Sequence, residues 1–149
     1  MKLKDHSHKK ISIIGAGNVG ATVAQLCAYK ELGDIVLLDI LEGFAAGKAL
    51  DLAQSGPLEK FNCKITGTAD FKKTQESDVV VITSGLPRKS GMTREDLRDT
   101  NAEIVRSVAT ELIKYSPDTF LIVVTNPLDT MTWVAKKYIT PGTLGCFWT

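Results

Sequence analysis

Three closely spaced glycines follow the first apolar run of the sequence. Residues 15–20 read Gly-Ala-Gly-Asn-Val-Gly and fit the pattern GxGxxG between an expected strand and an expected helix. In that context the first glycine permits a tight turn, the second lets the backbone approach a pyrophosphate, and the third lets helix and strand pack closely. The amino end of the helix adds unpaired N–H groups and a positive partial charge. The motif predicts a dinucleotide site, with an ordinary strand-to-helix turn as the alternative.

A carboxylate stands at the end of the second apolar run. Asp39 lies 19 residues beyond Gly20, a spacing at which an acid accepts hydrogen bonds from the adenosine ribose hydroxyls. It favours NAD over NADP, because a 2′-phosphate would meet a like charge and no arginine follows closely. A solvated acid at a strand end is the alternative for Asp39 alone. A methyltransferase, which also uses a glycine-rich turn and an acid after its second strand, is the competing class, whereas the P-loop pattern is absent.

Arginines appear in the segment after the fourth apolar run, residues 83–97. Arg88 and Arg94 stand among glycines and a proline at the sheet edge where ligands bind. A planar guanidinium suits a carboxylate substrate, and Gly85 and Gly91 are candidate hinges of a lid. The alternative is a polar surface loop that leads into the next helix.

Thr93 and Asn126 can each be interpreted as the N-cap of a helix. Thr93 stands where it would cap the long helix, with Asp96 completing a capping box. Asn126, in the Thr-Asn-Pro corner after the fifth apolar run, is read from the residues alone as a helix cap rather than a ligand-binding residue. Pro127 suits the first position of the helix that follows.

Short β-branched runs alternate with segments of helical period, which is typical of a parallel sheet with helices on both faces. We expect strands at 11–14, 35–38, 64–66, 79–83 and 120–124. Helices are expected at 18–30, with an apolar face of Val19, Val23, Leu26 and Cys27, at 44–52, ended by Gly56-Pro57, and at 93–115. The predicted fold is an α/β doubly wound parallel sheet, for which the glycine turn after the first strand implies the strand order 3-2-1-4-5 of dinucleotide-binding domains. Its ligand lies across the switch point between strands one and four.

Composition limits the classes of function. The 149 residues carry 18 Lys+Arg and 17 Asp+Glu, a net charge of +1 that offers no general attraction to nucleic acid or an anionic membrane. The three cysteines are far apart without a CxxC pair, which argues against a disulfide framework or a zinc site and for a reducing, cytoplasmic location. Neither a membrane span nor a signal peptide is recognised. We expect a basic arm at 1–9, one dinucleotide-binding domain at 10–138 and an atypical tail at 139–149.

Taken together, GAGNVG, Asp39, GLPRKSGMTREDL, Asn101 and VTNPLDTMTW resemble the NAD-dependent malate dehydrogenases of the lactate/malate dehydrogenase superfamily, in its lactate-dehydrogenase-like branch. The resemblance covers residues 10 to about 137. It implies a Rossmann domain, NAD as the cofactor, and reversible hydride transfer between malate and oxaloacetate, a step of the tricarboxylic acid cycle. The residues then expected to bind NAD are Gly15, Ala16, Gly17, Asn18, Val19, Gly20, Asp39, Thr83, Ser84, Gly85, Asn101, Val124, Thr125 and Asn126.

The same resemblance implies the substrate site. Arg88 would bind the second carboxylate of malate or oxaloacetate, Arg94 would polarise the reacting carbonyl as the catalytic residue, and Asn126 would touch the substrate. Lactate dehydrogenases resemble this loop but carry glutamine at the place of Arg88. A buried second carboxylate requires a cationic partner, so malate is favoured, with lactate or another 2-hydroxy acid as the alternative. The family also often has a cis bond at the corner formed by Asn126 and Pro127.

The acid/base histidine of this reaction, which the family pairs with an aspartate, has no counterpart here. His6 and His8 are the only histidines and precede the first expected strand. We therefore expect a truncated chain without the C-terminal substrate domain, one strand short of the usual six. Its function is then that of a malate dehydrogenase by family, of an isolated NAD-binding module without turnover, or of a self-associating interaction protein. Family members form homo-oligomers, but the sequence identifies no interface.

Overall fold

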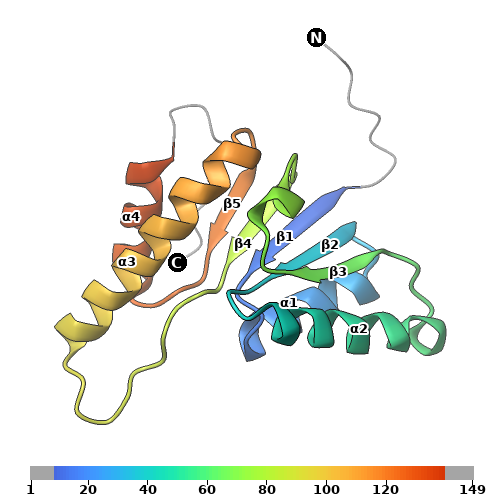
Figure 1. Cartoon of the computed structure of the whole chain (residues 1–149), viewed down its shortest axis with the longest axis horizontal. Coiled ribbons are helices and arrows are strands. Elements are labelled where there is room, and N and C mark those ends of the chain that lie inside the picture. Colours follow the sequence, from blue (N-terminus) through green and yellow to red (C-terminus); the bar gives the residue numbers. More distant parts are fainter. Residues whose placement is uncertain (1–8, 140–149) are drawn as a thin grey trace.

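The computed structural model describes residues 9–139 and contains a five-stranded sheet of order β3-β2-β1-β4-β5 (Figure 1). The strands are β1 Lys10–Ile14, β2 Asp34–Leu38, β3 Ile65–Thr68, β4 Val79–Ile82 and β5 Phe120–Val123. Every neighbouring pair is parallel. The predicted doubly wound fold and strand order are confirmed. The expected basic arm and atypical tail fall, apart from Lys9 and Ile139, outside the described residues.

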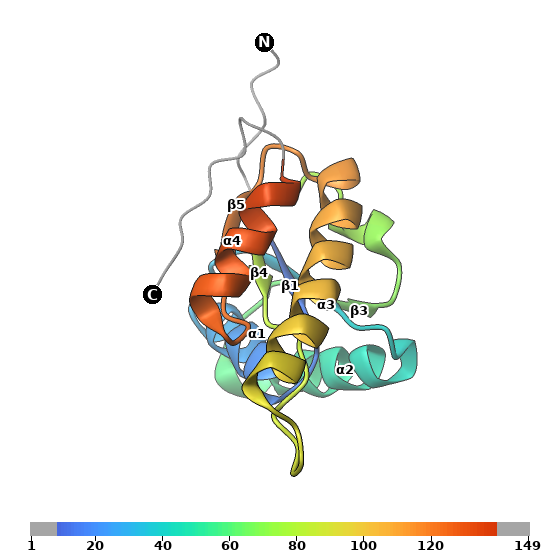
Figure 2. The same ribbon diagram turned by 90° about the vertical axis from the view of Figure 1, so that its left-hand side faces the viewer.

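Helices cover both faces of the sheet, which the two views show from the front and from one side (Figures 1 and 2). Helices α1 Asn18–Tyr29 and α2 Glu42–Glu59 pack on one face, and α3 Arg94–Tyr115 and α4 Leu128–Tyr138 on the other. Successive strand residues serve opposite faces: Ile13 and Leu37 join the α1/α2 core, while Ile14 and Leu38 join the α3/α4 core. Strands buried on both faces read as continuous apolar runs, which is why the pattern located them.

The apolar face predicted for α1 is partly wrong. Its fully buried residues are Gly20, Ala24 and Ala28, four positions apart, whereas Val19 and Leu26 are 55% and 52% exposed. The small side chains let the helix lie close to the strands, so the larger apolar residues remain at its margins or face outward. Val23 and Cys27, at those margins, are partly buried as expected.

The end predicted for the second helix is also wrong. Helix α2 runs through Pro57 to Glu59 and ends where Lys60 adopts a left-handed conformation with φ 62°. Pro57 stands in the last turn, where it removes one backbone hydrogen bond but does not stop a helix that already packs on the sheet. The next helix, α4, begins one residue later than expected, since Pro127 is its N-cap.

Strand β3 is longer than its sequence pattern indicates because its pairing with β2 continues to Thr68 opposite Leu38. Gly67 within it faces the backbone of Ala45 on α2, so closely that a Cβ would lie 2.4 Å from the Ala45 carbonyl carbon. A short 3-10 helix, η1 Phe71–Thr74, follows β3. Among residues 9–139, no helix combines the length and hydrophobicity that crossing a bilayer requires.

Candidate functional site

The glycine turn leads from β1 into α1 at the middle of the sheet. Gly15 has φ 107°, a conformation that side chains disfavour, and its N–H donates to the Leu38 carbonyl at 2.7 Å. A Cβ at Gly15 would lie 2.8 Å from the Ser84 nitrogen, and one at Gly20 would overlap the Gly15 carbonyl oxygen. A Cβ at Gly17 would meet nothing within 4 Å. Two of the glycines are therefore required by the fold itself, whereas Gly17 faces open space.

The amino end of α1 is left available for an anion. Gly17 is the N-cap, no side chain caps the helix, and the first turn carries no acidic residue. The first intrahelical hydrogen bond of this end runs from the Ala21 N–H to the Gly17 carbonyl at 2.9 Å. The N–H groups before Ala21 thus have no partner within the helix, and together with the helix dipole they favour a phosphate.

Asp39, directly after β2, reaches the same turn. One carboxylate oxygen accepts a hydrogen bond from the Ala16 N–H at 2.8 Å, and the other accepts one from the Leu41 N–H at 3.2 Å. These bonds hold the acid against the glycine turn and the start of the following loop. A carboxylate oxygen accepts more than one hydrogen bond, so Asp39 retains the capacity to bind the hydroxyls of a ribose.

A cavity of about 550 Å³ opens above these groups. It is lined by Ile14, Gly15, Gly17, Leu38, Asp39, Ile40, Phe71, Thr83, Ser84, Gly85, Leu86, Glu103, Ile104, Ser107 and Val108. The structure thereby brings together the glycine turn, the acid after β2 and the residues that follow β4, as the sequence predicts for the carboxyl edge of the sheet.

The opposite wall of the cavity was missed from the sequence. Phe71 comes from η1, while Glu103, Ile104, Ser107 and Val108 come from one side of α3. Ile40 was also missed: the sequence shows an isoleucine directly after Asp39, but only the structure shows that it is 89% exposed. A mostly apolar slot with a few polar groups is the usual form of a cofactor site.

Thr83 and Ser84 connect β4 to the glycine turn. The Thr83 hydroxyl lies 3.1 Å from the Ile14 carbonyl oxygen and 3.0 Å from that of Gly15, as the donor. The hydroxyl of Ser84 is buried and has no hydrogen-bond partner within the described residues. The hydrogen bonds of Thr83 fix the turn at the switch point, where the strand order reverses between β1 and β4.

Asn101 lies behind the cavity rather than on its surface. This residue of α3 is 2% exposed, and its side-chain amide donates to the Asn126 carbonyl at 2.7 Å and to the Leu86 carbonyl at 3.2 Å. Its side-chain oxygen accepts the Leu86 N–H at 2.8 Å. Thr125 completes the connection by donating to the Ser84 carbonyl at 2.8 Å. These bonds join the segments that follow β4 and β5.

The Asn126–Pro127 peptide bond is cis, as the resemblance implied. The Asn126 side chain does not cap α4, whose N-cap is Pro127 without a side-chain hydrogen bond. The neighbouring Val124 is 37% exposed and donates its N–H to the Ile82 carbonyl at 2.9 Å.

The arginine segment projects away from the sheet before α3 begins (Figure 1). Arg88 and Arg94 are exposed, and none of the described residues that line the cavity is an arginine. The Arg88 Nε donates to the Met92 carbonyl at 3.2 Å. The structure therefore does not bring Arg88 and Arg94 to the nucleotide cavity.

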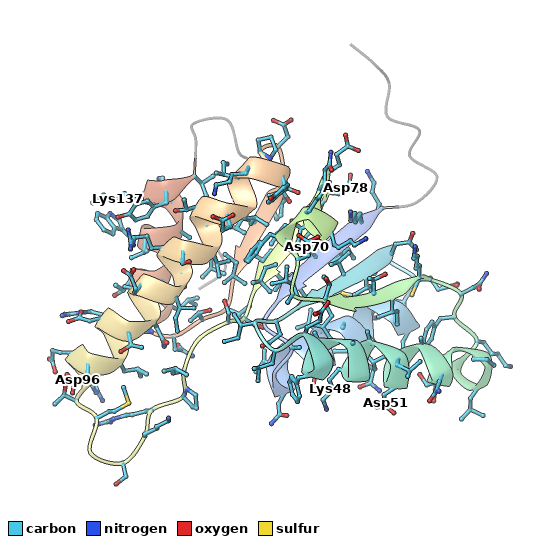
Figure 3. The ribbon with its side chains drawn as sticks, in the orientation of Figure 1. Lys48, Asp51, Asp70, Asp78, Asp96 and Lys137 are labelled. Atoms are coloured by element: carbon cyan, nitrogen blue, oxygen red, sulfur yellow. The ribbon has the colours of Figure 1, made fainter. Side chains whose placement is uncertain are left out.

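A capping box opens α3, as the sequence predicts. The Thr93 hydroxyl accepts from the Asp96 N–H at 3.0 Å, and the Asp96 carboxylate accepts from the Thr93 N–H at 3.0 Å. Asp96 stands at the outer end of the helix (Figure 3). Its hydrogen bonds with Thr93 lower the pKa of this exposed carboxyl. Among residues 9–139 no group of three or more histidine, cysteine or acidic side chains is placed to hold a metal ion.

Comparisons with known proteins agree with this geometry. A family described as lactate/malate dehydrogenase, NAD binding domain, matches residues 9–141. The malate dehydrogenase of Desulforudis audaxviator is 61% identical over 129 residues, which are 87% of this chain and 42% of that protein. The crystal structure of Cryptosporidium parvum malate dehydrogenase matches with a TM-score of 0.87 and 48% identity, covering 94% of this chain and 45% of that one.

A further solved structure contains the nucleotide. The malate dehydrogenase of Archaeoglobus fulgidus in complex with NADH matches with a TM-score of 0.85 and 40% identity, covering 89% of this chain and 46% of the other. In each of these comparisons the chain spans less than half the length of the protein it matches.

Proposed function

The chain belongs to the lactate/malate dehydrogenase family, matching its NAD-binding domain, and on that premise we propose that it holds NAD for the interconversion of malate and oxaloacetate. When bound, NAD supplies the acceptor or donor of the hydride. The part of this chain is to bind the nucleotide, orient it and keep its phosphates at the amino end of α1.

The open space at Gly17 is the observation that carries the proposal. The fold itself forbids a side chain at Gly15 and Gly20 but not at Gly17, where a Cβ would meet nothing within 4 Å. A pyrophosphate that lies against the backbone there accounts for Gly17, the second glycine of the motif. The uncapped amino end of α1 suits its charge, and Asp39 on the same cavity suits the adenosine ribose.

The substrate end is proposed from the resemblance of the arginine segment. Arg88 would bind the second carboxylate of the substrate, Arg94 would polarise its carbonyl, and Asn126 would touch it. Both arginines are exposed on the segment before α3, so they would act only after that segment closes over the nicotinamide. A permanently charged fork at Arg88 favours a dicarboxylate, whereas lactate would leave it unpaired.

Binding of NADH to the 149-residue chain tests the proposal. The binding is detected by energy transfer from tryptophan to the nicotinamide. Gly17→Val places a side chain in the open space, at a φ of −63° that valine adopts, and should weaken NADH binding at least about tenfold without unfolding the chain. Gly47→Val, also directed into open space but on α2, is the matched control. Equal affinities of the two variants would contradict the proposed phosphate position.

A rate assay addresses the second candidate, a binding module without turnover. Residues 9–149 contain no histidine, so the acid/base group that such a hydride transfer uses is not assigned within them. We therefore expect the 149-residue chain to bind NADH without oxidising it in the presence of oxaloacetate. Steady oxidation of NADH by the purified chain would exclude the binding-module interpretation.

A further inference from the structure

The nucleotide cavity contains a second acid to which no role has been given. Asp39 and Glu103 are the only charged residues among the described residues that line it, and no basic residue does so. A carboxylate beside an anionic cofactor is unfavourable unless it accepts a hydrogen bond from that cofactor. Asp39 has the ribose hydroxyls as proposed partners, whereas Glu103 is paired with Arg106 and has no proposed partner on the cofactor.

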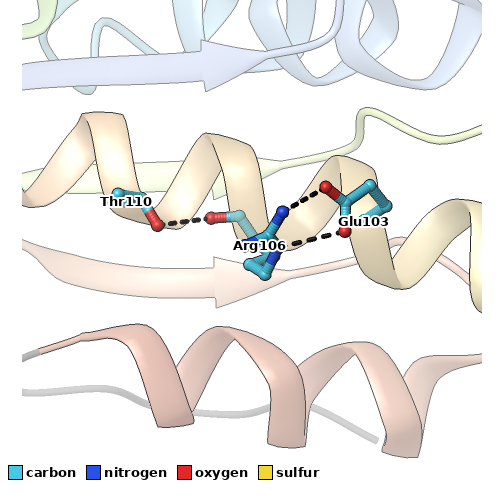
Figure 4. Close-up of polar contacts among 3 residues, drawn as sticks. All are labelled: Glu103, Arg106 and Thr110. Atoms are coloured by element: carbon cyan, nitrogen blue, oxygen red, sulfur yellow. Dashed lines mark hydrogen bonds and ion pairs between the residues drawn. The ribbon is translucent and has the colours of Figure 1, made fainter.

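Glu103 stands on the side of α3 that faces the cavity, beside Ile104 and Ser107, across from the end of β2. Arg106, one turn further along, binds its carboxylate with both arms of the guanidinium: Nε donates to Oε2 at 3.0 Å, and Nη2 donates to Oε1 (Figure 4). Arg106 also lies 6.0 Å from the centre of the Tyr138 ring on α4. Arg106, which lies against Tyr138 of α4, thereby orients the carboxylate of Glu103.

The same arginine favours the ionised form of Glu103. The hydrogen bond from Arg106 lowers the pKa of the Glu103 carboxyl, so at neutral pH it is ionised and only accepts hydrogen bonds. Each carboxylate oxygen has further acceptor capacity beyond its bond with Arg106. Beyond its bonds with Arg106, the 66% exposed side chain of Glu103 therefore offers further acceptor capacity at the edge of a mostly apolar slot.

The chemistry of the ligand indicates which group could use the remaining acceptor capacity of Glu103. With the ribose at Asp39, the base of the nucleotide enters the slot formed by Ile40, Phe71 and Ile104. Apart from the ribose hydroxyls, the adenosine half of NAD has one strong donor, the exocyclic amino group of adenine. We propose that the carboxylate of Glu103, oriented by Arg106, accepts a hydrogen bond from this amino group and so selects adenine over bases that carry a carbonyl there. This inference rests on the proposed function.

Reduced nicotinamide hypoxanthine dinucleotide tests the inference, because its base carries a carbonyl in place of the amino group of NADH and a proton on the neighbouring N1. The wild-type chain should bind NADH about five- to tenfold more tightly than this analogue, since the carbonyl would face a carboxylate. In Glu103→Gln the two affinities should agree within about twofold, because an amide presents either its oxygen or its NH₂. Both ligands carry the same reduced nicotinamide, so the same fluorescence signal measures the affinity of each in a separate titration.

Glu111→Gln is the matched control. Glu111 lies on the same helix and binds Lys114 three residues on, as Glu103 binds Arg106, but it does not line the cavity. This variant should retain the wild-type preference. Equal binding of the two dinucleotides by the wild type, or an unchanged preference in Glu103→Gln, would overturn the role of Glu103 while leaving NAD binding intact. Failure of the wild type to bind NADH at all would overturn the proposed function and this inference together.

Discussion

At the scale of single residues, the site separates positions that the fold requires from positions that a ligand requires. Gly15 and Gly20 have neighbours against which a Cβ would collide, and Gly17 has none. Asp39 belongs to both classes, because its carboxylate holds the Ala16 and Leu41 N–H groups while facing the cavity. Substitutions at these residues should therefore differ in what they damage.

Asp39→Ala should weaken NADH binding by about 10- to 100-fold, because it removes a charged acceptor of the ribose hydroxyls and loosens the turn. A fluorescence titration measures the change. Asp51→Ala, an exposed acid on the second helix (Figure 3), should leave the dissociation constant unchanged. An unchanged affinity in Asp39→Ala would show that the ribose lies elsewhere.

Gly20→Ala should lower the free energy of unfolding by about 3 kcal/mol or more, because the added methyl group overlaps the Gly15 carbonyl oxygen and the helix must move off the strand. Gly43→Ala, in open space on α2, should raise stability by up to about 1 kcal/mol. Urea denaturation followed by circular dichroism measures both. Similar stabilities of the two variants would contradict the close packing of α1 described here.

At the scale of elements, helix α3 positions both the buried network behind the cavity, through Asn101, and one wall of the cavity, through Glu103. Helix α3 begins at the capping box, holds Asn101 in the buried network behind the cavity, and presents Glu103 and Ile104 to the nucleotide slot. Because these residues share one rigid helix, a loosened first turn should affect the segment before α3 more than the cavity wall further along.

Thr93→Val should lower the free energy of unfolding by about 1 kcal/mol at pH 7, because the Asp96 N–H loses its cap. Chemical denaturation of the two proteins measures the difference. A difference near zero would mean that water replaces the hydroxyl at no cost.

The same substitution should change a titration. In the wild type the pKa of Asp96 is held below its ordinary value of 3.8 by Thr93, so the contribution of Asp96 to stability is present above that ordinary value and is lost as pH falls through the lowered pKa. In Thr93→Val the pKa of Asp96 should rise toward 3.8. Carboxyl chemical shifts measured by NMR across this range would detect it, and an unmoved pKa would assign the shift to another group.

At the scale of the whole molecule, the sheet brings five segments to one edge of the domain. The glycine turn, the β2 end, η1, the segment after β4 and α3 all contribute to the cavity. A ligand that contacts all of them should stabilise the folded chain as a unit.

NADH at about one hundred times its dissociation constant should raise the free energy of unfolding by about 2.7 kcal/mol, equivalent to an increase in Tm of about 5 to 10 °C. NADPH at the same concentration should raise it much less, because its 2′-phosphate would meet Asp39 in a cavity that no described basic residue lines. Thermal unfolding with each nucleotide measures this. Equal shifts would mean that the acid does not select between them.

The sequence by itself determined the positions of the strands, the glycine turn, Asp39 and the capping box at Thr93. Each of these depends on residues adjacent along the chain, where periodicity, turn chemistry and spacing are readable. The buried face of α1 and the end of α2 were predicted less well, since packing on the sheet overrode the local pattern.

Only the tertiary structure decided which distant residues complete the site. Phe71, Glu103 and Ile104 are separated from the glycine turn by more than fifty residues, and they meet it because the doubly wound sheet places η1 and α3 over the end of β2. The tertiary structure likewise assigned Asn101 to a buried network rather than to the cavity surface. A side chain's neighbours across the sheet depend on how elements pack, and no local pattern in the sequence records that packing.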